Sequence, residues 1–355
     1  MKVLVLEEGR GSHIHGGAFS RGFGLTNAQV IHYKWLFIDV GTKFEPSFLR
    51  RLFSLYKSIE NRFSFGFFVN RLNSKIKQFA KESNPDFVFI YRGIHVYPST
   101  VRYLSEELGL TVYGYNNDDP FSDQYPRYYW RHYLKSLPYY THVFSYRQKN
   151  IEDYSSIGIQ SNLLRSYYLK DQNFPIQNLP DNCKYLSDVS FIGHYEKDGR
   201  DKMLLSLLQS GVTLKIYGPE WHRSPLYFQL IELLGYEIEP IKGSDYNLAI
   251  NACKIALVFL SKINNDTYTR RCFEIPATKT MMLAEYTEDL TSMFEAGKEV
   301  DFFNSREELL QKINFYLSEN RYADVGAAGY ARLIKDGHEI TDRCYQIVNY
   351  FNQDI

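Results

Sequence analysis

The chain has 355 residues, of which 44% are hydrophobic and 23% are charged, and its formal net charge is zero. This composition excludes an intrinsically disordered chain and provides enough residues for two α/β domains. No stretch approaches the ~18 consecutive apolar residues that indicate a membrane span. The four cysteines form no CxxC pair, which argues against a zinc site or a disulfide framework. Because the first residues lead into a strand pattern instead of a signal peptide, we expect a reduced, cytoplasmic protein.

The charges are unevenly distributed along the chain. Residues 1–170 hold 22 basic and 14 acidic side chains, whereas residues 171–355 hold 19 and 27. A basic half predicts contact with an anionic partner, such as a membrane surface, a phosphate-bearing acceptor or nucleic acid. Attraction between two domains explains the same asymmetry. The segment from Arg50 to Lys81 mixes Phe, Leu and Tyr with cations, which indicates either a peripheral membrane contact or a helix with one face in the core.

Short apolar runs alternate with helical patterns in the first half. Helices are predicted at Ser47–Glu82, with a break near Gly66, and at Ser99–Leu108. The alternation is typical of parallel βαβ units. The predicted strands are Val3–Leu6, Leu36–Val40, Phe87–Tyr91, Thr111–Tyr115 and His142–Tyr146.

The alternation of short apolar runs and helical patterns begins again after residues 171–188. These residues carry Pro, Asn and Asp without an apolar period and are predicted to be a linker. The tail from Arg321 to Asn352 is helical with a break near Gly337, and its last helix is a candidate to cross back to the first domain. We therefore predict Rossmann-like domains at residues 1–170 and 189–355. The predicted strands of the second are Val189–Ile192, Thr213–Tyr217, Ile255–Leu260, Met281–Ala284 and Val300–Phe303, and its helices are Arg200–Leu208, Pro225–Leu234, Thr269–Ala277 and Arg306–Ser318.

Two glycines follow predicted strands of the second half. Gly193 ends one strand and precedes Arg200 at a helix start, and Gly218 ends the next strand. A glycine at the carboxyl end of a parallel strand lets a ligand approach the backbone, and a helix N-terminus offers N–H groups to a phosphate. Arg200 would add a bidentate cation. Ordinary tight turns explain the same glycines.

The most informative segment is Asn265–Ala277. Thr267 or Thr269 is suited to cap a helix, on which Arg271 and Glu274 would share one face. A carboxylate can accept hydrogen bonds from both hydroxyls of a ribose, and an arginine can neutralise a diphosphate. An intrahelical surface ion pair is the simpler interpretation of these two residues.

Residues 185–350 resemble the glycosyltransferase group 1 family, in particular its spore-maturation CgeB-like branch. The matching stretches are Ser190–Gly193, Lys215–Trp221, Arg271–Ala277, and the tail with His338 and Arg343. The resemblance implies a GT-B fold, in which two Rossmann-like domains face a central cleft. It also implies a nucleotide-diphosphate sugar as co-substrate, with no other cofactor and no metal.

The family resemblance also implies roles for single residues. Glu274 matches the second glutamate of the family's spaced pair, which binds the ribose. The first falls on Asp266, a departure from the family pattern. The family's phosphate contacts carry over to Gly193, Arg200 and Arg271, and Gly218 is counted with this donor-binding set.

The first half offers candidates for the acceptor side. A glycine-rich loop, Gly9–Gly17, contains His15, and Asn116–Pro120 contains Asp118 and Asp119. Tyr91–Gly93 also follows a predicted strand, so all three segments are expected at one edge of the sheet. Asp118, Asp119 and His15 are the candidate catalytic residues. The two aspartates also fit a helix-capping turn, and His15 fits a hydrogen-bonded structural histidine.

These features predict a metal-independent glycosyltransferase of glycan biosynthesis that moves a sugar to a hydroxyl on a glycan, a lipid-linked or a protein acceptor. A nucleotide-sugar epimerase with the same fold and a non-catalytic binding or maturation protein are the alternatives. Nucleic acid is an improbable partner because no recognised binding module is present.

Overall fold

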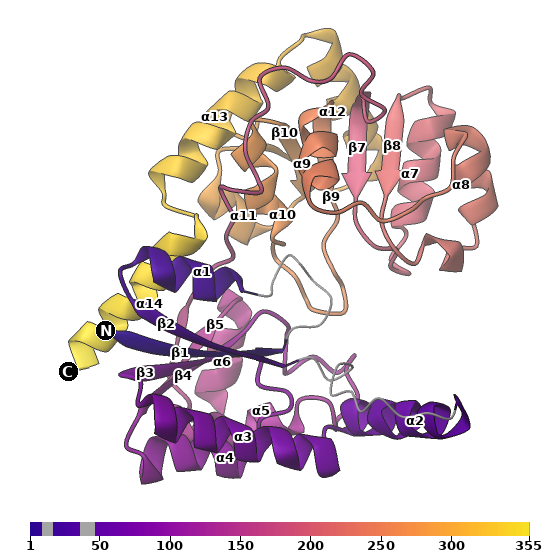
Figure 1. Ribbon diagram of the computed structural model, residues 1–355. Coiled ribbons are helices and arrows are strands. Elements are labelled where there is room, and N and C mark those ends of the chain that lie inside the picture. Colours follow the sequence, from indigo (N-terminus) through magenta and orange to yellow (C-terminus); the bar gives the residue numbers. More distant parts are fainter. Residues whose placement is uncertain (9–16, 36–46, 355) are drawn as a thin grey trace. The chain divides into compact units, whose positions relative to one another are not determined.

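The computed structural model describes residues 1–8, 17–35 and 47–354. The chain divides into two compact units, residues 1–165 with 340–355, and residues 166–339. Each unit contains one parallel β-sheet covered by helices (Figure 1). Among the described residues, no helix has both the length and the apolar character needed to cross a membrane.

The first unit contains a six-stranded parallel sheet with the order β2-β1-β3-β4-β5-β6. Its strands are β1 (Lys2–Glu8), β2 (Gln29–Trp35), β3 (Phe87–Tyr91), β4 (Thr111–Asn116), β5 (His142–Ser145) and β6 (Ser161–Leu163). Its helices are α1 (Ala18–Leu25), α2 (Ser47–Phe63), α3 (Phe67–Ser83), α4 (Pro98–Arg102) with a π-helical turn (Tyr103–Glu107), α5 (Arg131–Ser136) with a 3-10 turn (Leu137–Tyr139), α6 (Gln148–Ser156) and α14 (Ile340–Asp354).

Alternate side chains of the first sheet build two different cores. On β3, Phe87 and Phe89 face α1 and α14, which lie side by side (Figure 1). The ring of Phe89 is 4.7 Å from that of Phe19 on α1, and the ring of Phe87 is 5.0 Å from that of Phe351 on α14. The intervening aliphatic residues pack with α3 in a separate buried cluster. The two-residue period of a strand therefore gives β3 one aromatic and one aliphatic face.

The second unit contains a five-stranded parallel sheet with the order β11-β10-β9-β7-β8. Its strands are β7 (Ser187–Ile192), β8 (Leu214–Tyr217), β9 (Cys253–Val258), β10 (Met281–Glu285) and β11 (Asp301–Phe303). Its helices are α7 (Arg200–Gln209), α8 (Tyr227–Leu234), α9 (Ser244–Asn251), α10 (Arg271–Glu274), α11 (Glu288–Met293), α12 (Arg306–Ser318) and α13 (Tyr322–Lys335), with 3-10 turns at Trp221–Arg223 and Pro276–Thr278.

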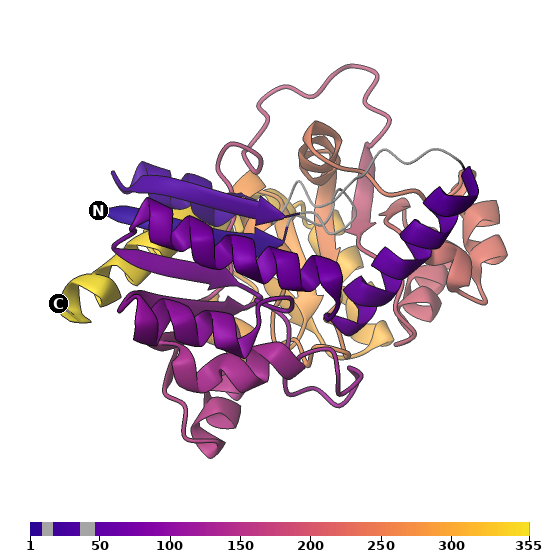
Figure 2. The ribbon, with the colours of Figure 1, turned by 60° about the horizontal axis from the view of Figure 1, so that its bottom comes forward.

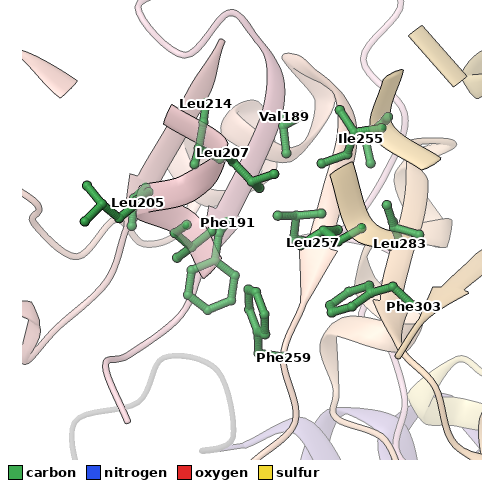
Figure 3. Close-up of a cluster of buried hydrophobic side chains, with 14 of the residues drawn as sticks. Val189, Phe191, Leu205, Leu207, Leu214, Ile255, Leu257, Phe259, Leu283 and Phe303 are labelled. Atoms are coloured by element: carbon green, nitrogen blue, oxygen red, sulfur yellow. The ribbon is translucent and has the colours of Figure 1, made fainter. Parts of the chain in front are cut away.

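The core of the second unit lies between the sheet and helices α7, α8 and α12. Figure 3 shows the rings of Phe191, Phe259 and Phe303 in a row at one end of this cluster. Their centroids are 5.1 Å and 5.7 Å apart in sequence order, close enough for direct edge-to-face contact. These rings lie at the ends of β7, β9 and β11, at the edge of the sheet where a ligand of a parallel sheet would be bound.

The structure corrects part of the predicted order of elements. The second strand is β2, which lies before the predicted Leu36–Val40, and residues 36–46 lie outside the described residues. The helical pattern from Ser47 divides near Gly66 into α2 and α3, as predicted. The first unit ends at Arg165 and includes α14, whereas residues 166–186 belong to the second unit and contain neither a helix nor an extended strand.

Candidate functional site

The order of the second sheet reverses at β7, which lies between β8 and β9. The chain leaves β7 towards β8 on one side and later returns to β9 on the other. Ligands of open parallel sheets bind outside the carboxyl ends of the strands at such a reversal. Residues 193–199, which follow β7, and residues 259–270, which follow β9, therefore define the candidate site. The first sheet reverses at β1 in the same way, but residues 9–16, which contain His15, lie outside the described residues.

Gly193 and Gly218 bring the ends of β7 and β8 together. A Cβ atom on Gly218, whose φ is 151°, would lie 1.9 Å from the carbonyl oxygen of Gly193. A Cβ atom on Gly193 would lie 2.9 Å from Nη2 of Arg271. The N–H groups of the two glycines donate to the carbonyl oxygens of Tyr217 and Glu239. Both glycines therefore provide space for close packing, and their N–H groups are already used within the protein.

Arg271 lies against the end of β7. Its Nε donates to the carbonyl oxygen of Ile192 at 2.5 Å, and its side chain is partly exposed. Within the described part of the chain, its Nη groups and the N–H of His194 have no protein partner. A guanidinium that is held by one bond while its other donors stay open is suited to bind a phosphate.

Glu274 is buried, and its carboxylate is held from two sides. Its Oε1 accepts a hydrogen bond from Nε of Arg270 at 2.6 Å, and its Oε2 accepts one from the hydroxyl of Tyr246 at 2.5 Å. Burial and the charge of Glu274 hold the pKa of Tyr246 well above its ordinary value, so this hydroxyl remains a donor. Burial lowers the pKa of Arg270, but the charge and hydrogen bond of Glu274 together with the nearby Tyr167 and Tyr246 outweigh it, so the net shift of the pKa is upward.

This pairing corrects the expected geometry around Glu274. The sequence predicted Arg271 and Glu274 on one face of a helix capped by Thr267 or Thr269, with a surface ion pair between them as the simpler interpretation. Helix α10 instead begins after Arg270, neither threonine caps it, and Glu274 pairs with the residue four positions earlier. Arg271 turns towards β7. Glu274 is only 4% exposed, so its pair with Arg270 is buried and does not lie on the surface.

Arg200 is buried at the start of α7 and binds groups of the protein itself. Its guanidinium makes a bidentate ion pair with Asp198 at 2.6–3.0 Å and donates to the carbonyl oxygen of His194 at 2.9 Å. Asp198 also accepts from the N–H of Arg200 at the helix N-terminus. The carboxylate of Asp198 thus occupies the place that was predicted for a phosphate, and Arg200 holds the loop after β7 in shape.

The same loop contains a hydrogen-bonded pair of side chains that sequence reasoning did not single out. Nε2 of His194 lies 2.7 Å from Oε1 of Glu196. Burial raises the pKa of Glu196, but the hydrogen bond with His194 and the charge of Arg200 outweigh it, so the net pKa is lowered. Because the His194 ring is half exposed, it is available to a ligand at the end of β7.

In the first unit, Asp118 and Asp119 have different surroundings. Oδ2 of Asp118 lies 2.5 Å from Nη2 of Arg92 at the end of β3, and the pair is partly exposed. Asp119 is fully buried, and its Oδ1 accepts from the N–H of Phe121 and from the side chain of Asn150. The geometry therefore gives Asp119 the structural turn role, and only Asp118 remains accessible. Among the described residues, no cluster of three His, Cys, Asp or Glu side chains could hold a metal ion.

A wide recess of the second unit lies elsewhere. It has a volume of about 730 Å³ and is open to solvent beside the edge strand β8, between Lys215 and Lys242. None of the predicted donor residues lines it. A smaller cavity of about 10 Å³ lies under the candidate site and is lined by Ser190, Tyr246 and Arg271 among others. We therefore place the site by the chemistry at the end of β7 and not by the size of the recess.

Five residues of the site were missed in the sequence, namely His194, Glu196, Asp198, Tyr246 and Arg270. The spacing of Arg270 and Glu274 is that of an i,i+4 helical pair and was a usable signal. Asp198 precedes a helix start, which is a preferred position for a capping acid. Tyr246 carried no local signal because it lies 28 residues from Glu274 and meets it only through the fold.

Comparison with known proteins gives a partial family match. Residues 200–349 match a family model described as "Glycosyl transferase-like". This segment begins at α7 and includes Gly218, Arg271 and Glu274. No curated protein sequence matches the chain.

Solved structures match the fold over almost the whole chain. HepE from Anabaena in complex with UDP and glucose has a TM-score of 0.68 at 13% identity, with 99% of this chain and 100% of that chain covered. Sucrose-phosphate synthase from Thermosynechococcus elongatus has a TM-score of 0.66 at 11% identity, with 99% and 98% covered. A putative UDP-N-acetylglucosamine 2-epimerase from Listeria monocytogenes has a TM-score of 0.61 at 11% identity, with 98% and 94% covered.

The chain has the GT-B fold. The α/β class and the two parallel sheets that the sequence predicted are thereby confirmed. Identities of 11–13% establish the architecture and not the substrate. The residues at the end of β7 must therefore carry the argument for function.

Proposed function

We propose that the protein is a glycosyltransferase that moves a sugar from a nucleoside diphosphate to a hydroxyl acceptor. The observation that carries this proposal is the position of Arg271. Its guanidinium is fixed at the reversal point of the second sheet, with Nη donors open, inside the segment that matches the glycosyl transferase-like model. The donor is the only co-substrate that this mechanism needs besides the acceptor.

Arg271 stabilises the leaving group in this proposal. Transfer breaks the bond between the anomeric carbon and the diphosphate oxygen and forms one from that carbon to the acceptor oxygen, while the hydroxyl proton is released. Negative charge grows on the diphosphate as its bond breaks. Arg271 and the N–H of His194 stabilise that negative charge by hydrogen bonds. Neither donor has to move as the charge develops. The positive charge of Arg271 then stabilises the leaving group, which a metal ion does in other enzymes.

The surroundings of Arg271 keep it in this position. Gly193 leaves space for the guanidinium, and Arg200 fixes the shape of the following loop through Asp198 and the carbonyl oxygen of His194. We therefore assign Arg200 a positioning role in place of direct phosphate binding. The His194 ring, oriented by Glu196, lies at the mouth of the loop.

Glu274 binds the donor ribose in the same proposal. Arg270 and Tyr246 each use one lone pair of its carboxylate, and an ionised carboxylate has about four. The remaining lone pairs accept the two ribose hydroxyls. Because Glu274 is buried, Arg270 and Tyr246 also hold it at a fixed angle, which lowers the entropy that binding would cost.

Acceptor chemistry is assigned to the first unit. Asp118, paired with Arg92 at the carboxyl edge of that sheet, is the accessible carboxylate among our three predicted catalytic residues. If transfer inverts the anomeric carbon, Asp118 removes the proton of the acceptor hydroxyl. If transfer retains the configuration, Asp118 orients the acceptor. His15 and Asp119 are not given a role in this step.

A uridine diphosphate sugar is the first donor to test, because HepE was solved with UDP and with UDP-glucose. Thermal shift against nucleoside diphosphates and their sugars identifies the donor, since a ligand of the folded state raises the melting temperature. Product analysis with the best donor and a panel of hydroxyl acceptors then tests transfer. Binding of a nucleotide sugar with no product from any acceptor class would favour the binding-protein alternative.

A nucleotide-sugar epimerase is the second candidate, because a putative UDP-N-acetylglucosamine 2-epimerase is among the structures with a similar fold. An epimerase converts the donor without an acceptor. Incubation with the donor alone, followed by chromatography of the sugar, separates the two functions. A transferase leaves the sugar configuration unchanged until an acceptor is added, whereas an epimerase produces a second sugar at once.

A further inference from the structure

An apolar stripe runs along the exposed side of α2 in the first unit. Its members recur at the helical spacing of three and four residues and are 44–58% exposed, namely Leu52, Leu55, Tyr56 and Ile59. Phe65, in the turn after the helix, and Phe67, the first residue of α3, are 59% and 60% exposed. Soluble surfaces rarely leave such a contiguous apolar patch open without a partner.

The other side of α2 explains why the helix forms and is oriented this way. Phe53 packs edge-on against Phe68 of α3, with ring centroids 5.3 Å apart. Glu60 is buried and accepts from the N–H groups of Phe68 and Val69, at the N-terminus of α3. One face of α2 is thus fixed to α3, and the stripe on the other face stays exposed. Figures 1 and 2 show α2 extending past α3, away from the sheet of its unit.

The charges around the stripe have one sign. Residues 51–81 contain seven lysines and arginines and a single acid, Glu60, which is buried. At about 100° per residue, Arg51 and Arg62 lie along one edge of the stripe. An exposed apolar stripe bordered by cations without exposed acids is complementary to an anionic lipid surface, into which the apolar side chains insert.

We propose that α2 docks the protein on an anionic membrane surface, with Leu52, Leu55, Tyr56 and Ile59 at the level of the acyl chains and the cations among the headgroups. This function is independent of the donor site. It places the acceptor-side unit at the interface where a lipid-linked hydroxyl acceptor would be presented.

Flotation of the full chain with vesicles tests the proposal. At low salt the protein should float with vesicles of phosphatidylcholine mixed with phosphatidylglycerol and remain behind with phosphatidylcholine alone, and added salt should weaken the association. The variant Leu55→Glu/Ile59→Glu should bind at least tenfold more weakly, because it places two acids in the stripe. The matched control is Ser54→Glu/Ser58→Glu, which adds the same charge to exposed positions on the same helix outside the stripe.

The control variant and the salt dependence distinguish membrane docking by the stripe from a general effect of added charge, from misfolding and from dimerisation. Circular dichroism should show folded protein in both variants, since all four positions are exposed. The control should keep most of its vesicle binding, and both variants should bind UDP as the wild type does. Absence of wild-type binding at low salt, equal losses in the two variants, or a wild-type dimer that the stripe variant dissociates without any vesicle binding would overturn the proposal.

Discussion

Nε of Arg271 donates a hydrogen bond of 2.5 Å to the carbonyl oxygen of Ile192, the last residue of β7. This contact joins the start of α10 to the strand at which the sheet order reverses. It explains why a glycine follows Ile192, since a Cβ atom on Gly193 would approach both Phe191 and the guanidinium. The site therefore depends on a backbone contact as well as on charged side chains.

Replacement of Glu274 by Ala should destabilise the fold. The change leaves the buried Arg270 without its carboxylate, and loss of one partner of a buried ion pair typically costs about 3–5 kcal/mol. Urea unfolding monitored by circular dichroism measures this. Lys298→Ala, which breaks the exposed pair with Glu295, is the control and should leave the free energy of unfolding nearly unchanged. Equal losses in the two variants would mean that Glu274 is not held as described.

The variant Tyr246→Phe tests whether the orientation of the Glu274 carboxylate contributes to UDP binding. It removes one donor to Glu274 while keeping the ring, and a hydrogen bond to a charged group is worth about 1.5–3 kcal/mol. Because Tyr246 orients the carboxylate without touching the donor, we expect weaker UDP binding with little change in kcat at saturating donor. A variant with wild-type affinity for UDP would show that the orientation of Glu274 does not matter for the ribose.

Replacement of Gly218 by Ala should destabilise the second unit by about 3 kcal/mol or more. The new methyl group would overlap the carbonyl oxygen of Gly193, and the φ of 151° disfavours any side chain. Gly199→Ala is the matched control, because Gly199 also has a positive φ but has no atom within 4 Å of the new Cβ position. Thermal unfolding should show a much smaller shift for Gly199→Ala. Similar shifts would mean that the contact between Gly193 and Gly218 is not tight.

The stability contribution of Glu196 should depend on pH. Its pKa in the folded protein lies below the ordinary value of 4.5, so the ion pair stabilises the fold above that value and the effect is lost as pH falls through the folded pKa. We expect wild type to exceed Glu196→Gln in free energy of unfolding at neutral pH, with the difference narrowing below pH 4.5. A difference that stays constant across this range would contradict the lowered pKa.

Asp118→Asn and Asp119→Asn should affect different properties. Asp119 is fully buried, so its replacement should lower the melting temperature of the protein. Asp118 is partly exposed beside Arg92, and its replacement should reduce transfer at least tenfold while UDP affinity stays at the wild-type level. Calorimetry and product analysis on both variants measure this. A stable Asp119→Asn variant without transfer activity would reverse the assignment.

The sequence predicted the elements whose burial leaves a clear pattern. Phe87–Tyr91 was identified at its exact bounds because all five residues are buried and bounded by turns. Strand β2 was missed because it is an edge strand whose residues alternate between exposed and partly buried, so it shows no apolar run. The second sheet was predicted more completely because three of its strands, β9, β10 and β11, are buried along almost their whole length.

The sequence predicted several residues of the site but not the contacts that these residues make. Gly193, Gly218 and Arg271 meet at the end of β7, which the strand-end rule for parallel sheets anticipated. The partner of Glu274 was misassigned because the choice between Arg270 and Arg271 depends on the residue at which α10 begins. A shift of one residue rotates a helical side chain by about 100°. Contacts such as Tyr246–Glu274 require the tertiary fold.

Calorimetric titration of UDP into wild type and Arg271→Gln tests the central claim most directly. Loss of a charged donor to the diphosphate should weaken binding at least tenfold, or ~1.4 kcal/mol. Lys254→Gln is the matched control, because Lys254 lies at the amino end of β9 in the same sheet and pairs with Asp188. Arg271→Gln should stay folded and lose UDP affinity, whereas Lys254→Gln should keep its UDP affinity. Unchanged UDP affinity in a folded Arg271→Gln variant would contradict the placement of the donor site at the end of β7.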